Sequence, residues 1–405
     1  MSSAGAATST GGASGGAPAI LVAEADPNEV CVPDPLANRW ISETLSVAQS
    51  SQVYRVGAGG ELTLLVLQRN GVLEVSRYTA GGWLDATPIP GTAGAYPLRV
   101  DVSPDGSLAL VLWSRDDTTL LSAFVDGAFR DPLAFPFPRS VDVAMFTGAR
   151  ALFGFADGQG INPIEYTPQA GLTRRASVLS NYNGLSATGP SSAAFFSRNS
   201  LVAGPDGLLP YVFGSGVDAR QDLPARVAMQ SVQQSFYFGF PNGRAMRVVR
   251  QWHDPVSDGL WATTRQADGW SAETRVTPEG SNDIYAPLVA DAGANLLMAW
   301  RGETRAFVRE HDGAAWLEAT NLNRSRALQP EMLLRGESSA LLIGQQSISA
   351  EKVSARKLYR RGADGTWYCA KLLPNALGFQ ATTSGNRFFV AQLVREQLEL
   401  SSFEP

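Results

Sequence analysis

Short apolar segments recur along the chain, and each directly follows a turn rich in Gly, Asp or Asn. Residues 61–68 (ELTLLVLQ) follow the turn Ala58-Gly59-Gly60, and residues 107–114 (SLALVLWS) follow Pro104-Asp105-Gly106. A segment that is apolar at nearly every position is typical of a strand covered on both faces, whereas a half-exposed strand alternates apolar and polar residues. The pattern therefore predicts buried central strands, each preceded by a tight turn.

Eight such turns divide the chain into units. They are centred near positions 59, 105, 148, 206, 242, 292, 337 and 385, so that successive turns are 36 to 58 residues apart. The longest and the shortest of these spacings lie on either side of the fourth turn, and they average 47 residues. This predicts one long loop and one shortened unit there. In this unit the buried strand is expected at 208–215 (LLPYVFGS), with Pro210 where a central strand would donate a hydrogen bond.

A second turn falls later in each unit and leads into an aromatic residue. Examples begin at Asp126-Gly127, Asp312-Gly313 and Asp364-Gly365. Asp-Gly between two strand-like segments is a strong hairpin signal, because a type I′ turn needs positive φ at both central residues. Each unit thus contains four strands, a to d, joined by a–b, b–c and c–d turns. Repeated four-stranded units of roughly 40–45 residues are typical of β-propeller blades.

The two ends of the chain predict how the ring closes. Residues 378–401 supply strands a, b and c of a last unit, whereas residues 38–45 (NRWISETL) match a strand d that no strands a to c precede. Pairing the two would remove an open sheet edge. The sequence therefore predicts an all-β fold, a β-propeller of eight four-stranded blades (alternatively seven), closed by the N-terminal strand d against the C-terminal strands a to c.

The Asp-Gly-x-x-Trp turn at 312–316 resembles half of an Asp-box, the repeat of sialidase-like (BNR-like) propellers in secreted bacterial proteins. The resemblance covers residues 38–405 and implies the propeller fold. The preceding Ser and the fixed Asp spacing of a full Asp-box are absent from this sequence. No arginine cluster matches the carboxylate-binding triad of sialidases either, so the resemblance implies the fold without the activity.

The N-terminal segment differs in composition from the rest. Residues 1–28 are dominated by Ser, Gly, Ala and Thr, which cannot bury enough apolar surface to fold, so we expect a disordered tether there and a single propeller domain over 29–405. The tether resembles the linker that follows the lipidated cysteine of bacterial outer-membrane lipoproteins. Thirty arginines against three lysines are typical of a high-GC bacterial genome. These features predict an extracellular, outer-membrane surface or periplasmic protein that has lost a possible lipid anchor from its N-terminus.

Net charge and hydropathy limit the partners. The formal charge of −5 does not provide the basic surface that nucleic-acid binding needs. No apolar run approaches the 18 residues of a membrane span. We expect a monomer that binds neither nucleic acid nor the membrane interior.

The ligand site is expected on the face that carries the b–c loops, because loops on a rigid scaffold usually carry function. Aromatic rings beside bidentate polar groups suit sugars as well as protein side chains. The candidate ligand-binding residues, all following strand b in their blades, are Trp113, Arg115, Arg250, Trp252, His253, Trp300 and Arg301. They differ from blade to blade, which favours one asymmetric site over a repeated sugar pocket.

A catalytic alternative rests on the pair His253 and Asp254. Asp254 could orient His253 as a general base, as in a glycoside hydrolase or polysaccharide lyase, and the carboxylates at 115–117 or 254–258 could hold Ca²⁺. The other histidine, His311, lies in an Asp-Gly hairpin and is expected at the surface. The leading prediction is a non-enzymatic protein that binds a glycan or a protein without a cofactor. A purely structural surface protein is the third possibility.

The two cysteines predict a disulfide. Cys369 lies at the start of strand d of the seventh unit, and Cys31 lies just ahead of the strand d that would complete the eighth. Those are outer strands of adjacent blades, and an exported protein can keep the bond oxidised. We therefore expect Cys31 and Cys369 to be bridged, which would hold the N-terminal segment beside the blade that it completes.

Overall fold

The computed structural model describes most of the chain as β-strands. The described residues are 32–46, 54–136, 141–156, 160–177, 184–188, 190–196, 207–217, 221–222, 232–240, 244–252, 258–266, 269–278, 284–292, 295–302, 305–322, 328–348, 353–373, 378–394 and 397–404. They contain 37 strands and one short 3₁₀ helix, η1 (Ala37–Arg39). Within these ranges no helix is long and apolar enough to cross a membrane.

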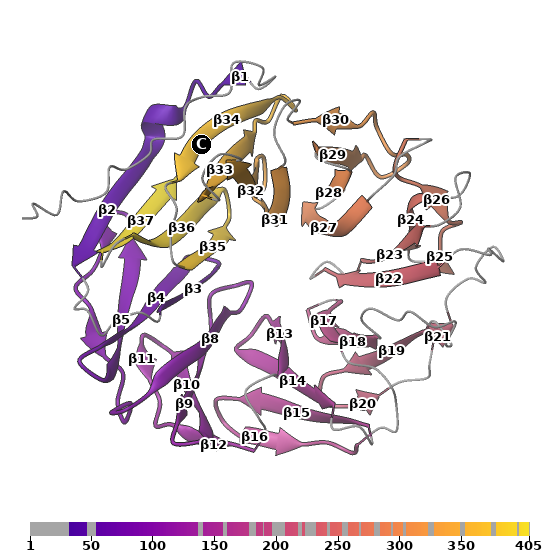
Figure 1. The fold of residues 1–405 in the computed structure, drawn as a ribbon. Helices are drawn as coiled ribbons and strands as arrows, with labels where there is room; N and C mark the ends of the chain where they lie inside the picture. Colours follow the sequence, from indigo (N-terminus) through magenta and orange to yellow (C-terminus); the bar gives the residue numbers. More distant parts are fainter. Residues whose placement is uncertain are drawn as a thin grey trace, which may run out of the picture.

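Eight sheets, antiparallel except where β1 joins one of them, stand around one axis, and each is a blade (Figure 1). Blade 1 consists of β3 (Tyr54–Gly59), β4 (Leu62–Arg69), β5 (Val72–Thr79), β6 (Gly82–Trp83) and β7 (Thr87–Pro88). Blade 2 consists of β8 (Tyr96–Val102), β9 (Ala109–Arg115), β10 (Thr118–Val125), β11 (Ala128–Phe129) and β12 (Leu133–Phe135). Blade 3 consists of β13 (Asp142–Phe146), β14 (Arg150–Ala156), β15 (Ile161–Thr167) and β16 (Gly171–Arg174). Blade 4 consists of β17 (Gly184–Ala187), β18 (Ser192–Phe196), β19 (Gly207–Val212), β20 (Gly216–Val217) and β21 (Gln221–Asp222).

The second half of the ring repeats this plan. Blade 5 consists of β22 (Val232–Gly239), β23 (Ala245–Trp252), β24 (Gly259–Gln266), β25 (Gly269–Trp270) and β26 (Thr274–Arg275). Blade 6 consists of β27 (Ile284–Ala292), β28 (Asn295–Gly302), β29 (Arg305–His311) and β30 (Thr320–Asn321). Blade 7 consists of β31 (Leu328–Arg335), β32 (Ala340–Ile348), β33 (Val353–Arg361), β34 (Trp367–Leu373) and the added β1 (Val32–Pro33). Blade 8 consists of β35 (Gly378–Ser384), β36 (Arg387–Val394), β37 (Gln397–Phe403) and β2 (Trp40–Ser46).

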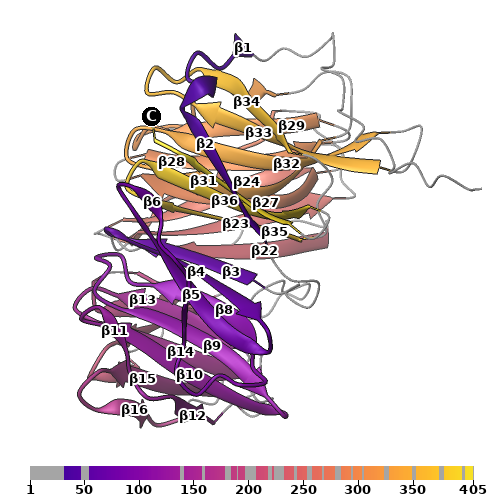
Figure 2. The same cartoon turned by 90° about the vertical axis from the view of Figure 1, so that its left-hand side faces the viewer.

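Blade 8 closes the ring as predicted. Its inner three strands are the last of the chain, and its outer strand β2 is among the first. The pairing of β2 with β37 is antiparallel and continuous, from Trp40 opposite Phe403 to Ser46 opposite Gln397. Figures 1 and 2 show the indigo β2 lying along the yellow C-terminal strands. The fold is therefore the predicted eight-bladed propeller, with closure between its terminal strands.

The N-terminal segment also joins blade 7 to blade 8. Before it enters β2, the chain pairs in parallel with β34, where Val32 lies opposite Tyr368 and Pro33 opposite Cys369. Cys31 lies outside the described residues, so its bond to Cys369 stays a prediction. Cys369 itself is not a free thiol in the structure.

Blade 4 corrects one assignment made from the sequence. The turn at 205–207 was expected between strands a and b, but the segment that follows it is strand c, β19. The a–b turn of this blade instead lies between β17 and β18. Pro210 is tolerated on β19 because the two outer strands pair on either side of it, β20 with Tyr211 and Val212 and β21 with Gly207 and Leu208.

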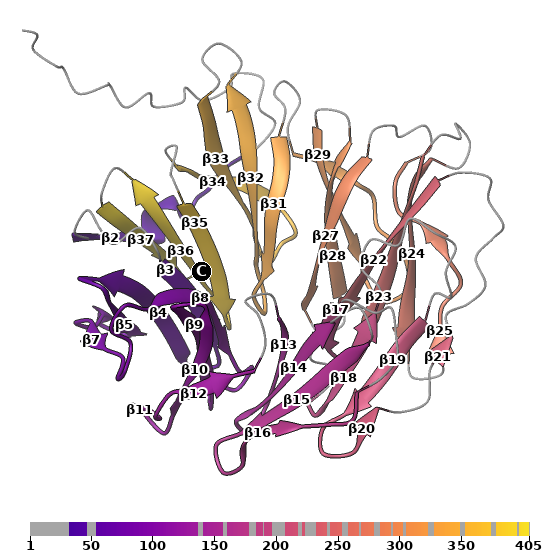
Figure 3. The same ribbon diagram turned by 60° about the horizontal axis from the view of Figure 1, so that its bottom comes forward.

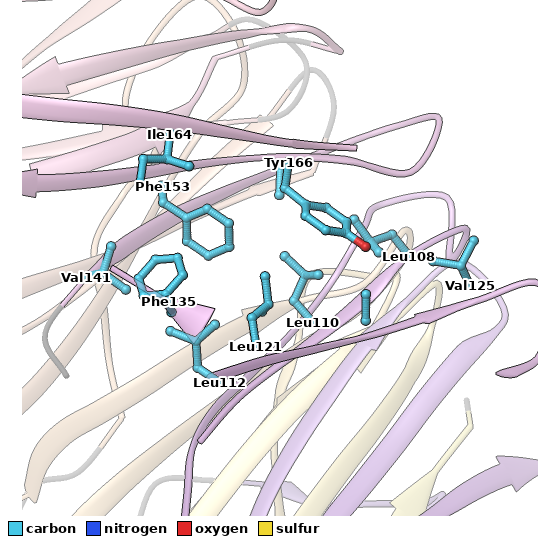
Figure 4. Close-up of a cluster of buried hydrophobic side chains, with 12 residues drawn as sticks. Leu108, Leu110, Leu112, Leu121, Val125, Phe135, Val141, Phe153, Ile164 and Tyr166 are labelled. Carbon is cyan, nitrogen blue, oxygen red and sulfur yellow. The ribbon is translucent and has the colours of Figure 1, made fainter. Parts of the chain in front are cut away.

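The core lies between neighbouring blades. Each strand b is apolar on both faces because one face packs against the preceding blade and the other against the following one. In Figure 4, side chains of β9 and β10 in blade 2 meet those of β14 and β15 in blade 3. Phe135 and Phe153 cross this boundary edge to face, with ring centroids 4.8 Å apart. The tilted view in Figure 3 shows the sheets standing side by side around the ring.

Hydrogen bonds link the a–b turns of successive blades on one face of the ring. The Oδ1 atom of Asn386 in blade 8 accepts from the backbone N–H of Ser338 in blade 7 at 2.8 Å. The Ser384 hydroxyl donates to the carbonyl of Gly60 in blade 1. Blades 1 and 2 approach so closely that a Cβ on Gly59 would lie 2.1 Å from the Ser103 carbonyl oxygen, so only glycine fits.

The same linkage continues through blades 2 to 4. The backbone N–H of Gly148 donates to Oδ2 of Asp105 at 2.7 Å, and that of Ala149 donates to Oγ of Ser107 at 2.8 Å. The Arg150 guanidinium then reaches the carbonyl of Pro190 in blade 4 at 3.2 Å. The face that carries the a–b and c–d turns is therefore held by direct contacts from blade to blade.

Candidate functional site

Two of the predicted ligand-binding residues belong to the core. Trp113 is fully buried in the cluster between blades 1 and 2, and its Nε1 donates to Oγ of Ser122 at 3.0 Å. Trp300 is buried between blades 5 and 6, where it stacks on Phe307 with centroids 5.7 Å apart. Placing these two rings at an exposed rim was wrong. Each strand b packs against blades on both sides, so a large apolar ring near its end is covered.

The predicted arginines do not form one cluster. Arg115 is exposed at the end of β9, 5.8 Å from the Trp113 ring centroid. Arg250 on β23 and Arg301 on β28 are half-buried. Arg115 in blade 2 and Arg301 in blade 6 lie on the same face of the ring. Blade 2 stands opposite blade 6 in a ring of eight, so these two arginines are far apart.

The remaining predicted residues are placed only in part. Trp252 is the last residue of β23, but its side chain is not among the described ones. His253 and Asp254 lie outside the described residues. Asp116 and Asp117, considered above as Ca²⁺ ligands, form the b–c turn of blade 2 with φ of 47° and 55°. Among the described residues no group of three or more His, Cys, Asp or Glu side chains could hold a metal ion.

The structure reveals a groove on the opposite face, where the a–b and c–d turns lie. Its volume is about 550 Å³, within the range of ligand sites. It runs between blades 1 and 2 and reaches blade 8 through Arg387. Its lining residues are Glu61, Leu62, Arg77, Tyr78, Thr79, Ala80, Asp105, Gly106, Ser107, Phe124, Asp126, Gly127 and Arg387. We call it the blade 1–2 groove.

Asp105 is the fixed anion of this groove. Its carboxylate accepts hydrogen bonds from the hydroxyls of Ser103 and Ser107, both at 2.7 Å, and from the Gly148 N–H. Loss of hydration alone would raise the pKa of Asp105. The hydrogen bonds, of which that from Gly148 is strongest, outweigh it and lower the pKa to about 2. Asp105 therefore stays ionised and serves to hold the turns together.

The two arginines of the groove differ in their partners. Arg387 is paired with Glu404, its Nε 2.8 Å from Oε2, and lies 4.0 Å from the exposed carboxylate of Glu61. Arg77 is exposed on β5, and among the described residues its guanidinium has no hydrogen bond or ion pair. Arg77 is thus the arginine of the groove that makes no direct hydrogen bond or ion pair within the described part of the chain.

Two aromatic residues line the groove, Tyr78 on the blade 8 side of blade 1 and Phe124 on the side of blade 2 that faces blade 1. Tyr78 packs edge to face on Trp83 and on Phe389, with centroids 5.4 and 4.9 Å apart. Phe124 packs in the same way on Phe129 at 5.1 Å. These neighbours hold both rings, so the apolar wall is preformed.

The groove could not be predicted from the sequence because its residues come from different blades. Arg77 lies near the end of β5, a strand c, and Asp105 lies in the next a–b turn, 28 positions later. The turn that contains Asp105 was identified only as the start of a buried strand, and the strand that carries Arg77 was not singled out. Arg77 and Asp105 come together because blade 1 packs against blade 2. The sequence indicates only that the a–b and c–d turns lie on the same face of the propeller.

Comparison with known proteins supports the fold alone. No protein-family model and no curated protein matches the chain. A prolyl endopeptidase structure is similar over 88% of this chain with a TM-score of 0.55 and 11% identity. The chain covers 56% of that enzyme, and likewise 56% of prolyl oligopeptidase B from Galerina marginata (85% of this chain, TM-score 0.52, 11% identity). The WD40 domain of SCAP from fission yeast is matched over 99% of its length and 91% of this chain, with a TM-score of 0.55 and 9% identity. At such identities the likeness identifies a β-propeller and no particular family.

Proposed function

We propose that this propeller is a non-enzymatic binding protein whose partner is a protein, held by a peptide segment in the blade 1–2 groove. The observation that carries the proposal is the groove itself, which combines a preformed apolar wall with an exposed, unpaired arginine. It lies on the face whose turns are hydrogen-bonded from blade to blade, so the site is rigid. A rigid site lowers the entropy lost on binding.

The chemistry of the groove favours binding over hydrolysis. A glycoside hydrolase needs a carboxylic acid of raised pKa facing a second carboxylate. Asp105 has a lowered pKa, and its oxygens are occupied by hydrogen bonds within the protein. Asp126 and Glu61 are exposed side chains at the margin. This set attracts basic groups of a partner but provides no general acid.

A protein partner is favoured over a glycan for a separate reason. Sugar sites use the open face of an aromatic ring, and two of the three tryptophans predicted to supply it, Trp113 and Trp300, are buried. Tyr78 is half-buried against other rings. Mixed charge beside apolar surface matches a peptide better.

The proposal includes the setting expected from the sequence. The Ser/Gly/Ala-rich residues 1–28 and the high ratio of arginine to lysine support a tethered, secreted protein of a high-GC bacterium, acting as a monomer at the cell surface. Western blotting of the membrane, periplasmic and secreted fractions of the source cells tests this part.

The groove can be blocked without disturbing the core. Ala80 is exposed in the c–d turn of blade 1 and lines the groove, whereas Ala170 is exposed in the c–d turn of blade 3, outside the lining. Peptides selected from a random display library on the wild-type protein should lose about tenfold or more in affinity on Ala80→Trp and none on Ala170→Trp. Peptides that bind both variants alike would place binding elsewhere, and a library without binders contradicts the proposal.

A further inference from the structure

Blades 1 and 6 can be aligned residue by residue from their strand pairing. In blade 1 the last a–b pair is Gly59 with Leu62, and two residues later Leu64 pairs with Arg77. In blade 6 the last a–b pair is Ala292 with Asn295, and two residues later Leu297 pairs with Glu310. Arg77 and Glu310 therefore occupy the same position on strand c, and their side chains leave the sheet on the same side.

The following blades align in the same way. In blade 7 the last a–b pair joins Arg335 to Ala340, which also pairs with Arg361 on strand c. In blade 2 the corresponding residue is Ala109, which pairs with Val102 on strand a and Phe124 on strand c. Val102 thus corresponds to Arg335, and Phe124 to Arg361.

Between blades 6 and 7 this position is neutralised within the chain. Glu310 is buried, its carboxylate contacts the guanidinium of Arg361, and it lies 3.6 Å from that of Arg335. Asn295 also donates to it at 3.0 Å. Charge from one blade is thus matched by charge from the next.

Between blades 1 and 2 the same position lacks its counter-charge. Arg77 stands where Glu310 does, but the two positions opposite hold Val102 and Phe124, which carry no charge. The result is the blade 1–2 groove, with an exposed guanidinium beside an aromatic wall. The missing group is a carboxylate, because a guanidinium pairs best with a planar anion that accepts two hydrogen bonds.

We infer that the partner supplies this carboxylate as an Asp or Glu side chain within its peptide segment, bound by Arg77, with an adjacent apolar residue against Phe124. The exposed carboxylates of Glu61 and Asp126 at the margin favour Lys or Arg on either side of that acidic residue. The partner segment is thus acidic at one position, apolar at the next and basic at its flanks. This inference rests on the proposed function.

Charge reversal separates the inference from the proposed function. The same random-peptide library is selected in parallel on wild type, on Arg77→Glu and on Arg305→Glu, which changes an exposed arginine at the far end of a strand c. Wild type and Arg305→Glu should select one conserved Asp or Glu, and Arg77→Glu should select Lys or Arg instead. Wild-type binders should lose at least about tenfold in affinity on Arg77→Glu. Thermal unfolding confirms that each variant is folded.

Each other outcome has a defined meaning. Binders that require Ala80 but show no conserved acidic residue, or are indifferent to Arg77→Glu, overturn the inference and leave the proposed function standing. Binders whose amidated forms fail overturn the choice of an internal side chain, because the anion is then the peptide C-terminus. A library with no binders overturns both.

Discussion

The guanidinium of Arg360 holds the carboxylate of Asp34 through two hydrogen bonds, of 2.8 and 2.6 Å, across 326 positions of sequence. Both side chains are buried. The Arg360 guanidinium also lies over the rings of Tyr368 and Phe403, 4.9 and 5.4 Å from their centroids. Phe403 belongs to blade 8 and Arg360 to blade 7, so this ion pair joins the N-terminal segment to both blades at the closure.

Asp34→Ala should destabilise the protein by about 3–5 kcal/mol, because it leaves the buried Arg360 guanidinium without its counter-ion. The free energy of unfolding in urea measures the effect. Asp126→Ala serves as the control, since Asp126 and Arg130 form an exposed pair 3.6 Å apart, and such pairs contribute less than about 1 kcal/mol. Equal losses in the two variants would contradict a closing role for Asp34.

Trp113→Ala should cost about 3–5 kcal/mol, because it removes a fully buried ring from the core between blades 1 and 2 and leaves a cavity. Arg115→Ala, two residues along the same strand, should change the free energy of unfolding by no more than about 0.5 kcal/mol. Guanidinium chloride titration of both variants checks the assignment. If Trp113→Ala proves neutral, the ring belongs to the surface.

The contrast between these residues shows what could be read from sequence. The a–b turns and apolar strands b are local signals, so seven of eight blades were placed correctly by pattern. Blade 4 was misread because its true strand b, β18, is a short segment of small and aromatic residues, whereas its strand c follows a Pro-Asp-Gly turn. Whether Trp113 faces solvent depends on the neighbouring blade, which no local pattern encodes. The groove depends on the same kind of contact.

His311 predicts a pH dependence of stability. It was expected at the surface but is buried, with its ring 5.1 Å from that of Trp316 and its Nδ1 accepting from the Gly313 N–H at 3.1 Å. Burial lowers the pKa of His311 below its usual value, and the charge of Arg244 lowers it further. The folded state therefore binds fewer protons than the unfolded state near the unperturbed pKa of about 6.5.

The stability that neutral His311 provides is present above pH 6.5 and is lost as the pH falls through the lowered folded pKa. Urea unfolding of the wild-type protein at pH 7.5 and 5.5 should show this loss, and His311→Gln should show less of it. All other side chains are the same in both proteins, so the difference between the two slopes isolates His311. Identical slopes would show that His311 is free to take a proton in the fold.

The disulfide between Cys31 and Cys369 remains a prediction that protein chemistry can decide. The residue after Cys31, Val32, pairs with Tyr368, the residue before Cys369, so the backbones of the two segments run side by side. Alkylation of the unreduced, denatured protein should modify neither cysteine, and reduction should lower the melting temperature. Closing so long a loop contributes up to about 5 kcal/mol in the chain-entropy model. Two alkylated thiols without reduction would exclude the bond.

The pairing of β2 with β37 also determines when blade 8 can form during synthesis of the chain. Ser42 and Ser401, whose hydroxyl oxygens are 3.1 Å apart, are 359 positions apart in the sequence. At about 5–20 residues per second, a ribosome takes roughly 20–70 seconds to make the one after the other. During that interval β2 is a strand edge without its partner, and such edges are sites of aggregation. Blade 8 can form only after β37 has emerged from the ribosome, and a premature stop just before residue 397 would leave β2 permanently unmatched.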